Sequence, residues 1–322
     1  MIKIFVNLLL SASLVNIFPI DGAVLELQAG REVAPDDLVS SLVYGPVAKL
    51  PVASNKTAQP PKKLDLQSFG VVTTAHSVVV MDAASGVPLF AKNPNEVRPI
   101  GSISKLMTAL VFLDTKPNLS EYVTVRPEDF AGTGRVHLYY NDSVRLQDVL
   151  GAALVGSDNT ATLALVRYSG LTYSDFVARM NAKASELGML MSEFEDPSGL
   201  SVKNVSTAGE LTVLLSEAEQ HQDIEQFMTA ASLTVRHTSG REVVIPSTNL
   251  LLTSALNSGA YKVTAGKTGY IPQAGYCLAT AVQHAGDTIY VVVLGASDLE
   301  ARFEDAMGLA VWTFNTFEWP AL

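Results

Sequence analysis

Residues 98–109 read Arg98-Pro99-Ile100-Gly101-Ser102-Ile103-Ser104-Lys105-Leu106-Met107-Thr108-Ala109. Past Pro99 the pattern is helical and apolar on most faces as far as Leu113, which is typical of a helix buried at the centre of a domain. Ser102 begins this helix and Lys105 follows three residues later, so the hydroxyl and the amine lie on one face, about one turn apart. Burial lowers the pKa of such an amine, and a neutral amine can accept the serine proton. The pair predicts Ser102 as a nucleophile and Lys105 as its base.

Two further motifs follow this pair in the chain. Ser157-Asp158-Asn159 lies between two helical runs, and Lys267-Thr268-Gly269 precedes a pair of apolar strands. By residue frequencies, Ser-x-x-Lys is expected about once by chance in a chain of this length and Lys-Thr-Gly about once in ten such chains. A second Ser-x-Asn, at Ser247-Thr248-Asn249, lies too close to Lys267 to be the middle motif. The three motifs in this order are the set known for class A β-lactamases and penicillin-binding proteins.

The remaining periodicity predicts an α+β fold. Two strand pairs are expected, at 76–92 near the start of the domain and at 275–295 near its end. Because strands lie at both ends with helices between them, we expect one antiparallel sheet built from the terminal strands and covered by helices. The expected helices after the first span residues 146–155, 159–168, 173–187, 206–219 and 299–317.

The N-terminal part of the chain predicts export. Within residues 1–23, Lys3 precedes an apolar run from Ile4 to Ile20, which is typical of a signal peptide. The exit of this run is a poor cleavage site, so an uncleaved membrane anchor is the alternative. Residues 24–72, rich in Pro, Ala and Ser, predict a flexible linker. The catalytic domain is expected at 73–318, in the periplasm or at the outer face of the cytoplasmic membrane.

Composition excludes several classes of function. The net charge of -10 in 322 residues argues against binding to nucleic acid. Cys277 is the only cysteine and lies in an apolar run, so we expect a structural, buried thiol. The five histidines are scattered, and neither a Gly-x-Ser-x-Gly elbow nor a His-Glu-x-x-His helix is present. A Ser-His-Asp hydrolase and a zinc peptidase are therefore disfavoured, and no metal or cofactor is expected.

From about His76 to Trp312 the chain resembles the low-molecular-mass penicillin-binding proteins, which are D-alanyl-D-alanine carboxypeptidases and endopeptidases. Its sequence is most similar to that of the short endopeptidase branch, whose members end soon after the catalytic domain. Besides residues 98–109, the similar segments are Met180-Asn181-Ala182-Lys183-Ala184, Leu187-Gly188-Met189, Asp196-Pro197-Ser198-Gly199-Leu200-Ser201, Asn204-Val205-Ser206-Thr207-Ala208 and Ala274-Gly275-Tyr276-Cys277-Leu278.

This resemblance implies a β-lactamase/DD-peptidase-like fold, with a helical subdomain beside the antiparallel sheet. It also implies peptidoglycan stem peptides as substrates and β-lactam antibiotics as covalent inhibitors. A membrane tether through the N-terminal segment is expected only if that segment is an uncleaved anchor. Ser102 would attack a D-alanine carbonyl, Lys105 would accept its proton, and Ser157 would protonate the leaving amine. Lys267 would keep Lys105 neutral by repulsion, and the backbone N–H groups of Ser102 and Tyr270 would form the oxyanion hole. The implied substrate-binding residues are Asn159, Lys267, Thr268, Gly269, Tyr270 and Arg302.

Three alternatives to a D-alanyl-D-alanine peptidase of defined preference are considered. A class A β-lactamase needs a Glu-x-x-Leu-Asn element, which the corresponding segment Glu193–Leu200 lacks. A non-catalytic protein that binds penicillin or peptidoglycan is disfavoured because all three motifs are intact. Carboxypeptidase and endopeptidase activities share the acyl donor and differ only in the leaving amine, so the motifs do not separate them.

Overall fold

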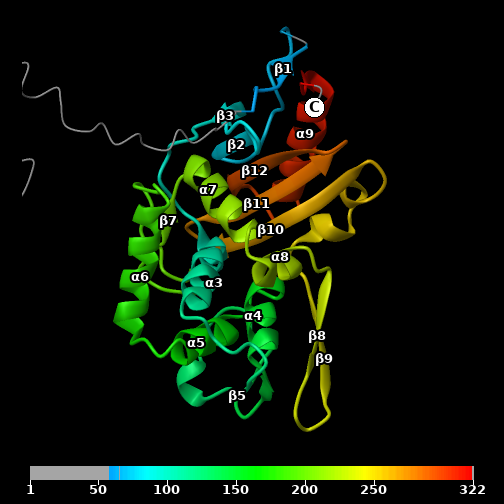
Figure 1. Ribbon diagram of the computed structural model, residues 1–322. Helices are drawn as coiled ribbons and strands as arrows, with labels where there is room; N and C mark the ends of the chain where they lie inside the picture. The colour runs from blue at the N-terminus through cyan, green and yellow to red at the C-terminus, as the bar shows by residue number, and fades with distance from the viewer. Residues whose placement is uncertain (1–57, 65, 321–322) are drawn as a thin grey trace, which may run out of the picture. The chain divides into compact units, whose positions relative to one another are not determined.

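The computed structural model describes residues 58–64 and 66–320 (Figure 1). Its helices are α3 (Ser104–Asp114), α4 (Leu146–Val155), α5 (Asn159–Tyr168), α6 (Tyr173–Glu186), α7 (Ala208–Glu219), α8 (Gln222–Met228) and α9 (Ala301–Thr316), with short 3-10 helices η1 (Gly101–Ile103), η2 (Pro127–Asp129), η3 (Leu250–Thr253) and η4 (Ala255–Asn257). Its strands are β1 (Lys62–Lys63), β2 (Ser77–Asp82), β3 (Pro88–Lys92), β4 (Arg98–Pro99), β5 (Tyr122–Thr124), β6 (Ser143–Arg145), β7 (Val205–Ser206), β8 (Ser232–Arg236), β9 (Glu242–Pro246), β10 (Tyr261–Ile271), β11 (Gly275–His284), β12 (Asp287–Ala296) and β13 (Phe317–Glu318).

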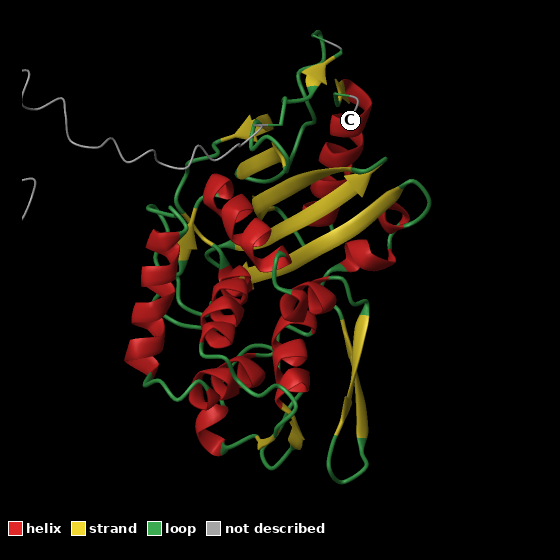
Figure 2. Ribbon diagram, viewed as in Figure 1, coloured by secondary structure: helices red, strands yellow, loops and turns green. Residues whose placement is uncertain are grey.

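A five-stranded antiparallel sheet joins the two ends of the folded chain. Its strand order is β10-β11-β12-β2-β3, so the N-terminal hairpin pairs with the C-terminal strands through β2 and β12. Along β2 the side chains alternate between the faces: Val78 and Val80 pack with α9, whereas Val79 packs with α3 and α7. Helices therefore cover both faces, which explains why β2 is apolar nearly throughout (Figure 2). The expected α+β architecture is confirmed.

The helical subdomain lies on the side of the sheet that α3 covers. Helices α4, α5 and α6 surround α3, and all of them contribute to one hydrophobic cluster with α7 and α8. Residues 104–112 of α3 are all buried, as expected from its apolar pattern. This burial fixes α3, and η1 at its start contacts β10 (Figure 1).

The expected helices occur where the periodicity placed them. α4 and α5 have the expected bounds, while α6 and α9 are one to two residues shorter at their ends. The periodicity predicted neither α8 nor the β8–β9 hairpin. Both are short: α8 has seven residues, and each strand of the hairpin has five residues with a single fully buried side chain, so their periodic pattern is too brief to stand out in the sequence.

The folded body begins before residue 73, inside the segment expected to be a linker. Lys62 and Lys63 form β1, which pairs with β13 after the last helix. The indole N–H of Trp312 also donates a hydrogen bond to Ser68 Oγ at 2.7 Å. These contacts join residues about 250 positions apart, so composition alone could not reveal them. The rest of the expected linker, up to residue 57, and the expected signal segment lie outside the described residues.

The burial of Cys277 was a further expectation. Cys277 on β11 is free and fully buried, and burial raises the pKa of its thiol to about 11, so its structural role is confirmed. In residues 58–64 and 66–320, no helix has the length and apolar character needed to cross a membrane.

Candidate active site

Ser102 and Lys105 lie where η1 passes into α3. The Lys105 Nζ atom is 2.9 Å from Ser102 Oγ, as expected for a spacing of three on one helical face. Ser102 is half-buried and lines a cavity, whereas Lys105 is only 1% exposed. The lysine amine also donates to Asn159 Oδ1 at 2.7 Å and to the carbonyl oxygen of Ser198. Its three neighbours hold it in one orientation beside the serine oxygen.

Burial lowers the pKa of Lys105 to about 7, even though the charges of Asp196 and Asp158 oppose this effect. Near neutral pH a large fraction of this amine is therefore unprotonated. An unprotonated amine within hydrogen-bond distance of a serine hydroxyl can accept its proton.

The Ser-x-Asn motif lies in the turn between α4 and α5. Ser157 has a φ of 57°, a left-handed conformation that costs a non-glycine residue about 1–2 kcal/mol. In this conformation its hydroxyl lies 2.9 Å from Lys267 Nζ. Asp158 caps α5 by accepting from the Ala161 amide, and its other oxygen accepts from the amides of residues 137 and 138. The cap thus fixes Asn159 at the start of α5.

The third motif lies on β10, an edge strand whose end approaches η1. A Cβ atom at Gly269 would lie 2.1 Å from the Ile100 carbonyl oxygen, so only glycine allows this close approach. Lys267 and Thr268 are buried, whereas Tyr270 is about half exposed. The Thr268 hydroxyl bonds that of Thr248 at 2.7 Å. The second Ser-x-Asn therefore supports β10 and does not replace Ser157.

The two motif lysines both have a lowered pKa. For Lys267 the largest cause is burial, followed by the positive charges of Lys105, Arg302 and Arg135. We expected repulsion from Lys267 to keep Lys105 neutral. For Lys105 burial is also the largest cause. The charges of the two amines repel each other, and this repulsion contributes to the lowered pKa of Lys267. That Lys267 helps to keep Lys105 neutral stays a prediction.

Arg302 lies on α9 and is 3% exposed, with its guanidinium facing the same cavity. It donates to the Gly269 carbonyl oxygen at 3.3 Å and lies over the ring of Tyr276 at 5.6 Å. Its Nε atom is buried and has no hydrogen-bond partner among the described residues. Burial lowers its pKa to about 10, so it remains a cation at neutral pH.

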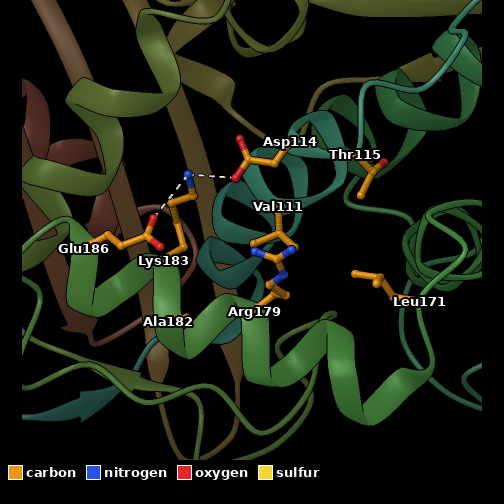
Figure 3. A pocket seen from close by; sticks show the side chains of 8 residues that line it. All are labelled: Val111, Asp114, Thr115, Leu171, Arg179, Ala182, Lys183 and Glu186. Atoms are coloured by element: carbon orange, nitrogen blue, oxygen red, sulfur yellow. Dashed lines mark ion pairs between the residues drawn. The ribbon is translucent and has the colours of Figure 1, made fainter.

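Residues from η1, from the Ser157–Asn159 turn, from β10 and from α9 line one open cavity of about 340 Å³. The residues that line it include no Asp or Glu: they are Ser102, Gly134, Arg135, Ser157, Asn159, Leu200, Thr268, Gly269, Tyr270, Tyr276, Leu299 and Arg302. Another cavity, of about 140 Å³, lies between α3 and α6 (Figure 3). There the amine of Lys183 forms ion pairs with Asp114 at 2.7 Å and with Glu186 at 3.6 Å, so these three charged side chains of the cavity wall are paired with one another.

Two features of the cavity were missed by sequence reasoning. The Ser198 carbonyl accepts from Lys105 in a turn held by Asp196, whose Oδ1 accepts from the amides of Ser198 and Gly199. The segment that contains this turn had been noted only as similar to the family. Arg135 lies on the cavity wall, and nothing in its local sequence distinguishes it from a surface arginine.

Hydrogen bonds join Ser102 to Lys105 and Ser157 to Lys267 at the edge of an antiparallel sheet covered by helices, and Asn159 also accepts from Lys105. This fold and site define a serine acyl-transfer enzyme of the penicillin-binding and β-lactamase-like class. The sequence profile of the D-alanyl-D-alanine carboxypeptidases matches residues 61–298, so the chain belongs to that family of serine peptidases.

Relatives and solved structures agree with this assignment. The D-alanyl-D-alanine endopeptidase of Pseudomonas aeruginosa is 34% identical over 267 residues, which cover 82% of this chain and 84% of that protein. The enzyme of the same name from Escherichia coli is 32% identical and covers 85% of each chain. A mutant of the Streptomyces K15 DD-transpeptidase superposes with a TM-score of 0.70 at 27% identity, covering 76% of this chain and 99% of that one. The D-alanyl-D-alanine carboxypeptidase of Mycobacterium tuberculosis gives 0.70 at 25%, covering 79% and 97%.

Proposed function

We propose that this protein is an exported serine DD-peptidase that cleaves D-alanyl peptide bonds of peptidoglycan, with Ser102 as nucleophile and Lys105 as base. The observation that carries this proposal is that Ser102 and Ser157 line one open cavity and are hydrogen-bonded to the buried amines of Lys105 and Lys267, respectively. A family member with these side chains assembled has what acyl transfer requires: a nucleophile, a neutral base and a proton donor for the leaving amine.

In the proposed reaction the Ser102 hydroxyl gives its proton to Lys105 Nζ while its oxygen attacks the D-alanine carbonyl. The tetrahedral intermediate would be stabilised by the backbone N–H groups of Ser102 and Tyr270, which the close packing at Gly269 brings to the same region. The C–N bond then breaks, and the leaving amine takes a proton from Ser157, which Lys267 replenishes at 2.9 Å. Water then attacks the resulting ester: Lys105 returns its proton to Ser102 Oγ, and the proton that the water releases passes through Ser157 to Lys267, so both lysines regain their starting states.

The remaining residues would bind the substrate. Asn159 would orient an amide of the acyl donor and also holds Lys105 in place at 2.7 Å. The amine of Lys267 and the guanidinium of Arg302, with the hydroxyl of Thr268, would bind the carboxylate next to the leaving amine. β-Lactam antibiotics would acylate Ser102 and act as covalent inhibitors. A β-lactamase activity is disfavoured because no carboxylate lines the cavity to activate a deacylating water.

Location follows from the substrate. Peptidoglycan lies outside the cytoplasmic membrane, so an enzyme that acts on it works there. Within that space we place the protein in the periplasm or at the outer face of the membrane. The apolar run from Ile4 to Ile20 supports export and, if it is retained, a membrane tether.

Purified protein is expected to hydrolyse cross-linked muropeptide dimers, and faster than it trims pentapeptides. This expectation rests on the endopeptidase relatives, which cover more than four fifths of both chains. Chromatography of a muropeptide digest, counting dimers lost against pentapeptides shortened, measures the preference. Trimmed pentapeptides with intact dimers would make the protein a carboxypeptidase, and a digest that changes neither substrate would reject peptidase activity.

The rate of covalent acylation by a fluorescent penicillin should rise with pH. Only the neutral amine accepts the serine proton, and burial sets the pKa of Lys105 at about 7. The second-order rate constant should therefore increase roughly 100-fold from pH 5 to a plateau near pH 8, because about 1% of the amine is neutral at pH 5. Circular dichroism at each pH controls for unfolding. A flat profile, or a rate that falls as pH rises through 7, would contradict Lys105 as the base.

A further inference from the structure

Residues 196–201 form a turn that lies against the backbone of the nucleophile. Gly199 in this turn has a φ of 82°, and a Cβ atom there would lie 2.1 Å from the Gly101 carbonyl oxygen and 2.9 Å from the Ser102 amide nitrogen. The next residue, Leu200, lines the cavity. A displacement of this turn would therefore change the surroundings of Ser102.

The side chain of Asp196 organises this turn. Its Oδ1 atom accepts from the amides of Ser198 at 2.6 Å and of Gly199 at 2.8 Å, and its Oδ2 atom accepts from the amide of Ser201 at 2.6 Å. Ser198 Oγ also donates to Oδ1, at 2.6 Å. Hydrogen bonds to a carboxylate are stronger than those between neutral groups. The carboxylate therefore fixes where the Ser198 carbonyl points.

The Ser198 carbonyl is one of three neighbours of the Lys105 amine. Lys105 Nζ is within hydrogen-bond distance of this oxygen, of Asn159 Oδ1 at 2.7 Å and of Ser102 Oγ at 2.9 Å. The first two oxygens have no hydrogen and can only accept, and Asn159 Nδ2 donates elsewhere, to the Thr133 carbonyl. A neutral amine has two N–H bonds and one lone pair. When both N–H bonds are given to these acceptors, the lone pair is left facing the Ser102 hydroxyl, as a base requires.

We propose that Asp196 is a positioning residue of the acyl-transfer site, which holds the Ser198 carbonyl against the Lys105 amine and thereby keeps the lone pair of that amine directed at Ser102. A backbone carbonyl has no side chain of its own to place it, so the group that binds the amides of its turn does so. The Ser102 hydroxyl lies 3.5 Å from the same carbonyl, too far to compete with the amine for it. This inference rests on the proposed function and adds to its machinery a residue that does not line the cavity.

The charge of Asp196 provides a second readout. It raises the pKa of Lys105 against the larger effect of burial, and so does the charge of Asp158. Lys267 is coupled to the same amine, since the charge of Lys105 lowers the pKa of Lys267. Asp158 and Lys267 are unchanged in a variant of Asp196, so a shift in the pH profile reports this carboxylate alone. A residue that only supported the fold would change the rate without moving the midpoint of the profile.

Asp196→Asn keeps the size of the side chain and one acceptor oxygen, but it removes the charge and the second acceptor. Over the pH range used for the wild type, acylation by fluorescent penicillin should be about tenfold slower on its plateau, because the amine is less well oriented. The midpoint of the rise should move to lower pH, since the loss of a negative charge favours the neutral amine. Asp196→Glu keeps the charge but displaces the two oxygens, so its plateau should fall while its midpoint stays at that of the wild type.

The matched control is Asp82→Asn. Asp82 Oδ2 accepts from the Ser85 amide at 2.8 Å in another turn, and neither residue lines the cavity. This variant should keep the plateau and the midpoint of the wild type, even if its melting temperature is lower.

Thermal unfolding shows whether each variant is folded, and if Asp196→Asn does not fold, Asp196→Glu carries the test alone. A plateau equal to that of the wild type in the folded variants would overturn the inference. A slower plateau with an unmoved or raised midpoint in Asp196→Asn would also overturn it. Failure of the wild type to be labelled at all would instead reject the proposed function, on which the inference rests.

Discussion

Ser102→Ala is expected to abolish covalent labelling by fluorescent penicillin and to lower peptide hydrolysis by at least about 10⁴-fold, as in other serine hydrolases. The physical reason is that no other described hydroxyl lies both in the cavity and within hydrogen-bond distance of Lys105. The fold should survive. Lys105 Nζ keeps Asn159 Oδ1 and the Ser198 carbonyl as acceptors, so the free energy of unfolding should change by less than about 1 kcal/mol. Gel fluorescence after denaturation and thermal unfolding measure the two quantities.

The matched control for this prediction is Ser104→Ala. The hydroxyl of Ser104 is on the same helix but points into the core, where it donates to the Gly101 carbonyl at 2.9 Å. Its removal should leave labelling intact, even if it lowers the melting temperature. Persistent labelling of Ser102→Ala at the wild-type rate would show that another side chain is the nucleophile.

Lys105→Met should slow acylation by 10²–10⁴-fold, the usual contribution of a positioned general base. Methionine keeps the aliphatic volume of the lysine stem, so the variant isolates the amine from the packing. It leaves Asn159 Oδ1 and the Ser198 carbonyl without their donor, which should cost about 1–3 kcal/mol of stability. Stopped-time labelling with fluorescent penicillin gives the rate, and the rise in rate between pH 5 and 8 should disappear with the amine.

Lys92→Met is the control for this second prediction. Lys92 is also held by backbone carbonyls, with 2.6 Å from its Nζ to the Ala75 oxygen, but it lies on β3 outside the cavity. Its loss should cost similar stability without slowing acylation. If Lys105→Met is labelled as fast as the wild type, then another group accepts the serine proton.

Local chemistry predicted a large part of this fold. α4 and α5 begin and end at the expected residues, because their apolar spacing and the cap at Asp158 are visible within about a dozen residues. The contact of Ser102 with Lys105 was also predictable, since a helix places residues three apart on one face. The elements that were not predicted are either short, as are α8 and the β8–β9 hairpin, or depend on residues far apart in the chain. The pairing of β1 with β13 is of the second kind, and it shows that the folded body begins before residue 73.

The sequence by itself determined the nucleophile and base candidates, the order of the three motifs and the α+β architecture, because each depends on near neighbours along the chain. Only the tertiary structure decided that Lys267 meets Ser157, 110 residues away. It also decided that the Ser198 carbonyl accepts a hydrogen bond from Lys105 and that Arg135 lines the cavity. Every residue has a backbone carbonyl and many protein surfaces have an arginine. Only the packing of the chain therefore distinguishes the Ser198 carbonyl and the Arg135 side chain from other groups of the same kind.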